Sequence, residues 1–544
     1  MTTGKCETSG RHDDRMKTKK ATTTIIKIIA AAAAIIMTMA AVLTTAGCNN
    51  GGKGKDPDSK LPTTNIAPEP LKPQAEIEDK GEEVTYTVNG TISSDMVVQR
   101  NAYFNVFGRS DNPGGIIYGE FMGETRYGIV NDEGSWEIQF SSHEATKEPQ
   151  TLTIYPKNGK VKEFKDILVG DVWVVSGQSN AELTYAFAAT KNPDYSSEIN
   201  PKDNIRLYTQ TRQSVLDAMA AGLDVTQPQE EAVSSTTRWE KTTTITVPPT
   251  TAIGYYFAKE LSRTVDVPLG IIEAASGGST LHELMPVDIA AELGFTTGPV
   301  VPPGGFYNTL LHPFTRNKIT GMIFYQGESE SAGGQYAVYA NNLKRTVSGY
   351  RQAWGLCFPF INVQLSSHGI QGENYWPELP MIRAAQFDAN RMMLNSYIVT
   401  AMDQGFQNGD PDWAHPCYKL ELGKRAAKIA AYVVYGQGDE AHSLAPEPDK
   451  IKWSSDNTIE ITFKNVGDGI TLLSGDEIVG LNVVDEYGDN MFCEIEMIDV
   501  FTVKITTTRK AVAISYGLSH YTSKKLPNVA SSDGIPMPAF LINR

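Results

Sequence analysis

The sequence feature that most constrains the fold is an apolar run that ends in a glycine turn. Residues 171–176 are mostly β-branched or aromatic, which predicts a buried strand, and Gly177 ends it. Ser179 follows two positions later, just before a stretch with helical character. Open α/β sheets place their ligands where a strand ends and a helix begins. Ser179 is therefore a candidate nucleophile, although a Gly-x-Ser turn taken alone also fits an ordinary loop.

Changes in residue pattern divide the 544-residue chain, which is too long for a single core, into five segments. Residues 1–48 have the layout of an export signal, and the polar stretch 49–83 predicts a disordered tether. Short alternating segments at 84–168 and 442–544, the first of them opening at 84–88, predict two β-sandwich-like domains. Between them, strands alternate with helical stretches over 169–441, which predicts an α/β domain with a largely parallel sheet. Within it, apolar residues at helical spacing predict a helix packed on the core: Tyr339, Leu343, Val347, Tyr350 and Trp354.

The first segment predicts that the protein is exported. A basic stretch at 16–20 precedes an apolar stretch at 28–43, and small residues follow up to Cys48. The Ala46-Gly47-Cys48 ending resembles a bacterial lipoprotein signal, which implies lipidation of Cys48 and a location at the cell surface or in the periplasm. A plain cleaved signal and an uncleaved anchor are the alternatives, and Met16 opens a better signal than Met1.

Charge and cysteine usage narrow the partners. The net charge is −15, so the protein is not suited to holding nucleic acid or an anionic bilayer by electrostatics. A membrane would be reached through the N-terminal lipid only. The three cysteines outside the first segment are widely spaced and form no Cys-x-x-Cys pair, which predicts buried thiols and neither a metal site nor a cofactor.

A serine nucleophile needs a base, and the base needs a group that orients it. Of the eight histidines, His415 has a ready partner because Asp412 lies three residues before it, ahead of a predicted helix at 422–435. In a tight loop this spacing places the carboxylate at Nδ1 and leaves Nε2 facing the serine. The alternative is that Asp412 or Asp410 caps the following helix and that His415 is a loop residue.

Two further predicted strands end in groups that suit an oxyanion hole. One strand, at 268–275, runs into Gly277 and Gly278, where a backbone N–H can approach a ligand closely. Another, at 319–324, ends before Gln326, whose side chain offers an amide. An ordinary turn and a solvated loop explain each stretch taken singly. Polar groups at the ends of several strands in one domain favour a site.

These residues carry a resemblance to a known family. In chain order, the stretches 177–180, 276–279, 325–329 and 412–416 look like the blocks of SGNH (GDSL-type) hydrolases, and more narrowly like the sialate O-acetylesterase family. The stretches 94–100, 170–173, 306–313 and 528–540 also look like that family, so the likeness covers nearly everything after the tether.

The resemblance implies a flavodoxin-like three-layer domain flanked by β domains, and removal of O-acetyl groups from sugars without a metal. It also implies roles for individual residues. Ser179 would be the nucleophile, His415 the base and Asp412 its orienting partner. The oxyanion hole would combine the Ser179 N–H, an N–H of Gly277 or Gly278, and the Gln326 side chain.

The sequence also departs from the family, and the departures bear on the substrate. The residues expected to contact substrate are Gln178, Asn180, Glu328 and His282. The residues that differ from the family's common ones are Ala181, His282, Leu284 and Glu330. These departures leave open whether the acetylated glycan carries sialic acid or is xylan or another plant polysaccharide. A surface lipoprotein that binds glycans without catalysis is the alternative of a different class.

Overall fold

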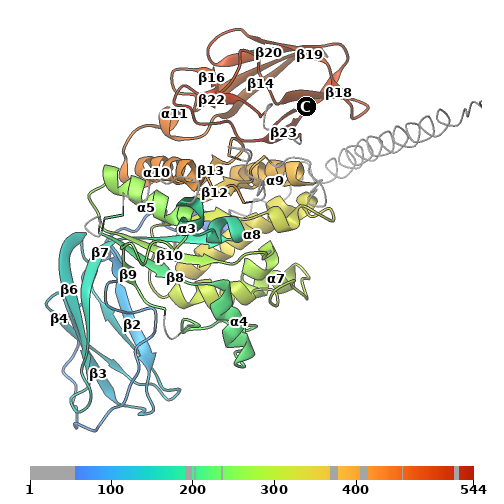
Figure 1. Ribbon diagram of the computed structural model, residues 1–544. Coiled ribbons are helices and arrows are strands. Elements are labelled where there is room, and N and C mark those ends of the chain that lie inside the picture. The colour runs from blue at the N-terminus through green and yellow to red at the C-terminus, as the bar shows by residue number, and fades with distance from the viewer. Residues whose placement is uncertain are drawn as a thin grey trace, which may run out of the picture.

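The computed structural model describes residues 56–189, 199–200, 204–234, 237–367, 378–404, 415–455, 457–519 and 526–544. Figure 1 shows an N-terminal group of β strands, a central layer of sheet and helices, and a C-terminal group of β strands on the opposite side of that layer. Asp412 and Cys48 lie outside the described residues.

The central sheet is largely parallel, as the sequence predicted. Its order is β13-β12-β11-β7-β10-β8-β9, and only the edge strand β9 is antiparallel. The inner strands are buried along their length because helices cover both faces, so they read as continuous apolar runs. The strands are β7 (Lys162–Gly177), β8 (Ile205–Thr209), β9 (Glu240–Lys241), β10 (Leu269–Ala275), β11 (Gly321–Tyr325), β12 (Phe360–Gln364) and β13 (Ser396–Thr400).

Four long helices pack beside this sheet. Helix α5 (Ala252–Thr264) packs against α10 (Lys419–Tyr435), and α8 (Tyr336–Trp354) packs against α9 (Leu379–Met392). In the view of Figure 1, α5 and α10 lie above the sheet and α4 and α7 lie below it. The 3.6-residue apolar pattern that predicted α8 is confirmed by the burial of Tyr339, Leu343, Val347, Tyr350 and Trp354. The shorter helices are α2 (Ser179–Glu182), α3 (Tyr185–Ala189), α4 (Arg212–Ala220), α6 (Leu281–Leu284), α7 (Val287–Glu292) and α11 (Glu440–Ser443).

Strand β7 runs without a break through two parts of the molecule. Its first half pairs with β6 (Thr146–Tyr155) and β1 (Val97–Gln99) of the N-terminal region, and its second half pairs with β10 and β11. The domain boundary expected at 168/169 therefore falls inside one strand. Gly170 does not break the strand, because its role is close packing: a Cβ there would lie 2.1 Å from the Pro268 carbonyl oxygen.

The N-terminal strands largely follow the predicted alternation. The strands are β2 (Phe104–Arg109), β3 (Ile116–Phe121), β4 (Glu124–Ile129) and β5 (Ser135–Phe140). The strand expected at 84–88 is wrong, because only isolated bridges form there, at Glu83 and Tyr86. The Val84 N–H bonds to Asn158 and the Thr87 N–H to Arg109, so this segment divides its backbone hydrogen bonds between two neighbours.

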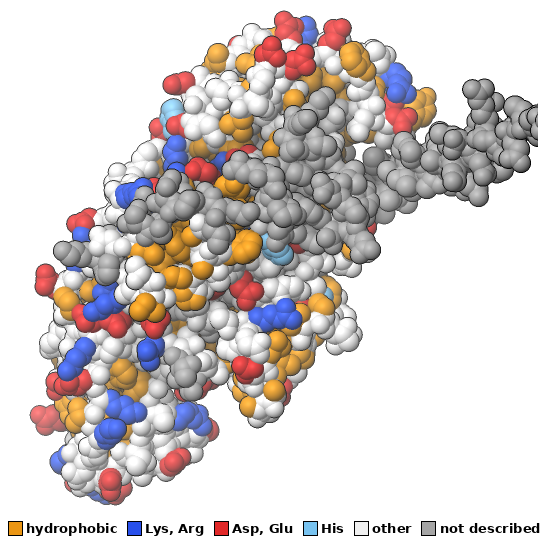
Figure 2. Space-filling model, viewed as in Figure 1, with side chains coloured by type: hydrophobic (Ala, Val, Ile, Leu, Met, Phe, Trp, Pro, Cys, Tyr) orange, Lys and Arg blue, Asp and Glu red, His pale blue; other side chains and the backbone are white. Residues whose placement is uncertain are grey.

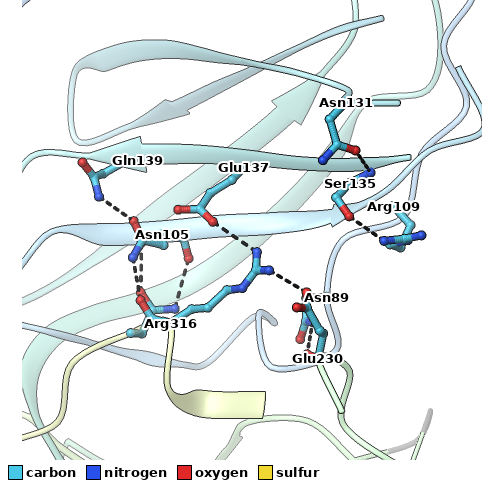
Figure 3. Close-up of polar contacts among 10 residues, drawn as sticks. Asn89, Asn105, Arg109, Asn131, Ser135, Glu137, Gln139, Glu230 and Arg316 are labelled. Atoms are coloured by element: carbon cyan, nitrogen blue, oxygen red, sulfur yellow. Dashed lines mark hydrogen bonds and ion pairs between the residues drawn. The ribbon is translucent and has the colours of Figure 1, made fainter. Parts of the chain in front are cut away.

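Polar contacts fasten β2 and β5 to the central part of the chain (Figure 3). The Arg316 guanidinium lies 3.1 Å from the Glu137 carboxylate and 2.6 Å from that of Glu230. Asn105 donates to the Arg316 carbonyl at 2.5 Å and accepts from Gln139 at 2.9 Å. The N-terminal strands therefore meet the central part of the chain through a specific polar interface in addition to the shared strand β7.

The tether predicted over 49–83 is wrong for its described part. A 3₁₀ turn, η1 (Pro57–Lys60), lies against α8, where Asp58 forms an ion pair of 3.0 Å with the fully buried Arg351. The Cys357 N–H donates to the Pro62 carbonyl at 2.8 Å. A buried guanidinium needs a carboxylate partner, and this polar segment supplies it.

The C-terminal strands form a four-stranded sheet β14-β15-β20-β19, a second four-stranded sheet β18-β17-β21-β23 and the pair β16-β22. They contact the central part through α9, where Phe387 packs against Phe540, and through Gln364, which donates to the Ala539 carbonyl at 2.9 Å. The strands are β14 (Glu447–Ser455), β15 (Thr458–Lys464), β16 (Ile470–Leu472), β17 (Leu481–Asp485), β18 (Asn490–Met491), β19 (Cys493–Met497), β20 (Thr502–Thr507), β21 (Ala511–Tyr516), β22 (Val529–Ser531) and β23 (Phe540–Asn543).

The described surface mixes both signs of charge. Figure 2 shows Lys and Arg side chains interspersed with Asp and Glu over the N-terminal strands on the face in view. Within the described ranges, none of the helices combines the length and the apolar character needed to span a bilayer.

Candidate active site

Ser179 stands at the carboxyl end of the central strand. Strand β7 ends at Gly177, whose φ of 134° is in the region that favours glycine, and a Cβ there would lie 2.0 Å from the Tyr325 carbonyl oxygen. Helix α2 begins at Ser179. Because β7 pairs with β10 on one side and β11 on the other, the serine lies where the strand order reverses, the usual ligand position in such sheets.

His415 meets this serine across 236 positions of the chain. Its Nε2 lies 2.8 Å from the Ser179 Oγ, within hydrogen-bonding distance. The ring is half-buried and precedes α10 by four residues. A neutral imidazole with its proton on Nδ1 can accept the hydroxyl proton directly in this geometry. The structure thus brings together the candidate nucleophile and the candidate base that the sequence singled out.

The two glycines after β10 are not equivalent. The Gly277 N–H donates to the Glu182 carboxylate at 2.7 Å, and the Gly277 carbonyl accepts from Arg212 at 2.7 Å. By contrast, the N–H groups of Ser179 and Gly278 donate to no acceptor within the described part of the chain. Gly277 adjoins the serine, since a Cβ on it would lie 3.6 Å from the Ser179 Cβ, and Gly278 is the next residue along the chain. Gly278 therefore offers the available N–H of this turn, with a φ of 75° that favours glycine.

Gln326 is fully buried, and its amide is already engaged. Its Nε2 lies 3.2 Å from the Gln178 Oε1 and also donates to the Glu330 carboxylate, while the Tyr339 hydroxyl lies 3.0 Å from the Gln326 Oε1. Both amide hydrogens thus point at protein acceptors. An oxyanion can therefore bind this side chain only if it replaces the Gln178 or the Glu330 oxygen as acceptor.

Three of the four residues expected to contact substrate are buried and form hydrogen bonds to other protein groups. Gln178, Asn180 and Glu328 are all at most 5% exposed. The Gln178 Oε1 accepts from the N–H groups of Gly327 at 3.2 Å and Ser329 at 3.3 Å. These buried side chains therefore stabilise the turns around the site.

The fourth, His282, lines a cavity. Its ring stacks on Phe295 with centroids 4.5 Å apart, and burial lowers the pKa of the imidazole. The cavity holds about 170 Å³ and is also bordered by Ser329 and Glu330, which connect it to the turn that carries Gln326. A hydrophobic and aromatic wall with a few polar groups is typical of a small-molecule site.

Two carboxylates of the short helix η6 (Glu328–Glu330) lie under the site. Burial raises the pKa of Glu330 to about 7. Burial also raises the pKa of Glu328, against the lowering effects of the Asn180 amide, Lys419 and His415. In the described ranges, no group of three or more His, Cys, Asp or Glu side chains is arranged to hold a metal ion.

Sequence reasoning missed two residues that contact this machinery. Lys419 is fully buried, and its Nζ donates to the Asn180 Oδ1 at 2.6 Å. Tyr339 was assigned to the core only, yet its hydroxyl reaches Gln326. The available signals were a lysine four residues after His415 and a hydroxyl on an otherwise apolar stripe.

Comparisons with known proteins point to the carbohydrate esterases. The family model described as "Carbohydrate esterase, sialic acid-specific acetylesterase" matches residues 169–431. The human sialate O-acetylesterase is 25% identical over 322 residues, which cover 53% of this chain and 57% of that protein, and the mouse protein is 24% identical over 362 residues, which cover 55% and 62%. The chain thus spans roughly three fifths of the length of these relatives.

A solved structure supports the fold. A carbohydrate acetylesterase from Xanthomonas citri matches with a TM-score of 0.72 at 24% identity, covering 84% of this chain and 99% of that one. The likeness at this identity concerns the fold alone, and it extends beyond the central sheet. Taken with the family match over residues 169–431, it confirms the resemblance drawn from the sequence: this chain is similar to the sialic acid-specific acetylesterases, a family of carbohydrate esterases.

Proposed function

We propose that this protein is an exported carbohydrate O-acetylesterase that hydrolyses acetyl esters on sugars by serine acyl transfer. The observation that carries the proposal is the 2.8 Å contact between the His415 Nε2 and the Ser179 Oγ at the end of the central strand. The order β10-β7-β11-β12-β13, with β8 added at one edge, agrees with a flavodoxin-like catalytic domain. We assign residues 169–441 to it and regard the flanking strands as β-sandwich-like domains.

The proposed reaction has two halves. In the first, His415 removes the Ser179 proton while Oγ attacks the acetyl carbonyl, and the resulting imidazolium then protonates the departing sugar oxygen. In the second, His415 removes a proton from water, the hydroxide attacks the acetyl-serine, and the proton returns to Ser179. Acetate and the free sugar hydroxyl are the products, and Asp412 is the group that we expect to orient the imidazole.

Negative charge develops on the carbonyl oxygen in both halves. We assign its stabilisation to the N–H groups of Ser179 and Gly278, since the Gly277 N–H is held by Glu182. Gln326 is the third donor of the proposal, and one of its hydrogens would turn from Gln178 or Glu330 to the oxyanion. Gln178, Asn180 and Glu328 then support the site, and His282 contacts the glycan.

The substrate we favour is an O-acetylated sialic acid, with acetylated xylan as the alternative. The relatives bear the name sialate O-acetylesterase, whereas Leu284 and Glu330 depart from the residues common in that family. Attachment to a membrane through lipidated Cys48 is part of the proposal, and the substrate reaches the site from outside the cell.

The test compares wild type with Ser179→Ala. Purified protein without residues 1–48 is assayed with p-nitrophenyl acetate, then for acetate release from O-acetylated sialic acid and from acetylated xylan. We expect hydrolysis that depends on Ser179 and a preference for the sialic acid ester. Equal rates for both proteins would refute the esterase, and glycan binding without turnover would favour the non-catalytic alternative.

A further inference from the structure

A continuous chain of buried polar side chains runs beneath Ser179. The Lys419 Nζ donates to the Asn180 Oδ1 at 2.6 Å, and the Asn180 Nδ2 donates to the Glu328 Oε1 at 2.5 Å. Lys419, Asn180 and Glu328 are 0%, 1% and 5% exposed. The amide thus presents its acceptor to the ammonium and its donor to the carboxylate, which is the polarity that a charged lysine and an ionised glutamate require.

These three residues come from the three segments that build the site. Asn180 directly follows the nucleophile on α2, Glu328 begins η6 after the Gln326 turn, and Lys419 begins α10 four residues after His415. The Lys419 ammonium also lies 5.0 Å from the centre of the Tyr325 ring. One hydrogen-bonded chain therefore joins the nucleophile turn to the helix that follows the base.

Stability alone gives a poor account of this arrangement. Removing an ammonium and a carboxylate from water has a large free-energy cost for each ion, and well-packed apolar residues often replace such pairs without loss of stability. The Glu328 Oε2 is in addition buried without a hydrogen-bond partner within the described residues. A buried pair with this cost beside the reacting groups points to a role in the chemistry.

We propose that Lys419 and Glu328 are positioning residues that act through Asn180. They hold the Ser179 turn in place against the start of α10, the helix that follows His415. Their opposite charges also balance each other near the His415 ring. The inference rests on the proposed function, since it concerns the same serine and histidine. It assigns Glu328 to the support of the base instead of to contact with substrate.

Several ionisable groups surround the chain and enter its charge balance. Glu328 interacts electrostatically with His415 and Lys419, with Glu330 from the same short helix, and with the hydroxyls of Tyr325 on β11 and Tyr339 on α8. Asp412 precedes His415 outside the described residues. Glu328 is the anion that stabilises the imidazolium from beneath, and Lys419 is the cation that offsets it.

The charge balance gives a test with a definite sign. Glu328→Gln keeps an oxygen to accept the Asn180 hydrogen bond but removes the negative charge, so Lys419 faces His415 uncompensated and the imidazolium becomes less stable. We expect the pKa of His415 to fall by about 0.5–1 unit, which moves the acid limb of kcat/KM for p-nitrophenyl acetate to lower pH by the same amount. Adding Lys419→Met to this variant removes the cation and should return the limb to near its wild-type position.

Two substitutions of Lys419 test whether this residue positions the Ser179 turn. Lys419→Met should lower kcat about 10- to 100-fold with little change in KM, and Lys419→Arg should recover part of the loss because it keeps a cationic donor. Lys424→Met is the matched control, since this lysine of the same helix is 41% exposed and contacts Glu421 at 2.9 Å. It should leave kcat unchanged.

The outcomes separate this inference from the proposed function. The pKa of His415 is also read by NMR titration of the labelled histidine ring, which needs no activity. An active wild type whose Glu328→Gln variant leaves both the acid limb and the His415 pKa in place would overturn the inference and leave the esterase standing. An inactive wild type in which the His415 pKa still falls would refute the esterase and leave only the charge coupling between Glu328 and His415, whereas an unchanged pKa there would refute both.

Discussion

Two carboxylates of the short helix η6 lie on different sides of Ser179. Glu328 lies on the side of His415 and is linked to a cation, whereas Glu330 lies on the side of Gln326 and has no such link within the described residues. On the side of the base, Asn180 links Glu328 to the Lys419 ammonium. On the side of the oxyanion, Glu330 accepts from Gln326 and from the Leu281 N–H, and it forms no ion pair within the described part of the chain. Burial raises the pKa of both carboxyls, to about 7 for Glu330, whereas the Asn180 amide and the Lys419 ammonium oppose this rise at Glu328.

The side of His415 should show the largest effect, because the proposed mechanism assigns the proton transfer to this residue. His415→Ala is expected to lower kcat for p-nitrophenyl acetate roughly 10⁴- to 10⁶-fold while the protein stays folded by circular dichroism. A double variant with Ser179→Ala should lose no more than either single variant, since the two residues act as a unit. A loss below tenfold would remove His415 from the mechanism.

The oxyanion side should show a smaller loss. Gln326→Ala is expected to lower kcat about 10²- to 10³-fold, the typical effect of removing one oxyanion donor. Gln364→Ala is the matched control, because this buried amide of the neighbouring strand β12 bonds to Arg383 and Ala539 away from the serine. Both variants should be less stable than wild type, but only Gln326→Ala should have a lower kcat. Similar kcat values for the two would show that Gln326 supports the fold alone.

The sequence predicts the helices, the strands and the Ser179–His415 pair, but it does not predict the buried polar contacts around them. Apolar periodicity predicted α8 and the parallel strands, because each pattern depends on neighbours close in sequence. The Ser179–His415 pair followed from the chemistry that a nucleophile requires. The engagement of Gln326 by Glu330 and the bridge from Lys419 to Asn180 could not be predicted, since they depend on which buried polar groups folding brings together.

The same limit explains the wrong expectations. Residues 49–83 looked like a solvated tether because they are polar, yet Asp58 pairs with Arg351 at a distance of 293 positions in the chain. Likewise, 84–88 alternates as a strand does, but its backbone bonds are shared between two partners. In both cases a long-range polar contact overrode the local pattern.

The uncompensated carboxyl on the oxyanion side should make stability depend on pH. An unfolded chain releases the Glu330 proton near the ordinary pKa of 4.5, whereas the folded protein retains it until about 7. The folded state therefore binds more protons in this window, so Glu330 makes stability fall as the pH rises from about 4.5 to 7. Glu330→Gln removes this dependence.

The measurement is urea unfolding of wild type and Glu330→Gln at pH 5 and pH 8. We expect the difference in unfolding free energy, variant minus wild type, to increase by up to about 3 kcal/mol from the lower to the higher pH. The change with pH matters more than the absolute values, because the amide also alters the hydrogen bond to Gln326. A difference that stays constant would mean that Glu330 is compensated as Glu328 is.

The smallest expected effect distinguishes support of Gln326 from support of the core. Tyr339 and Tyr350 are both fully buried tyrosines of α8; the first hydroxyl lies 3.0 Å from the Gln326 Oε1, and the second donates to the Leu284 carbonyl at 2.5 Å. Replacing either by phenylalanine removes one buried hydrogen bond and should cost about 1 kcal/mol of unfolding free energy. Only Tyr339→Phe frees the Gln326 amide to rotate, so only this variant should lower kcat, by about 3- to 10-fold. Equal kcat values for the two variants, with equal losses of stability, would mean that the Gln326 amide is held by Gln178 and Glu330 alone.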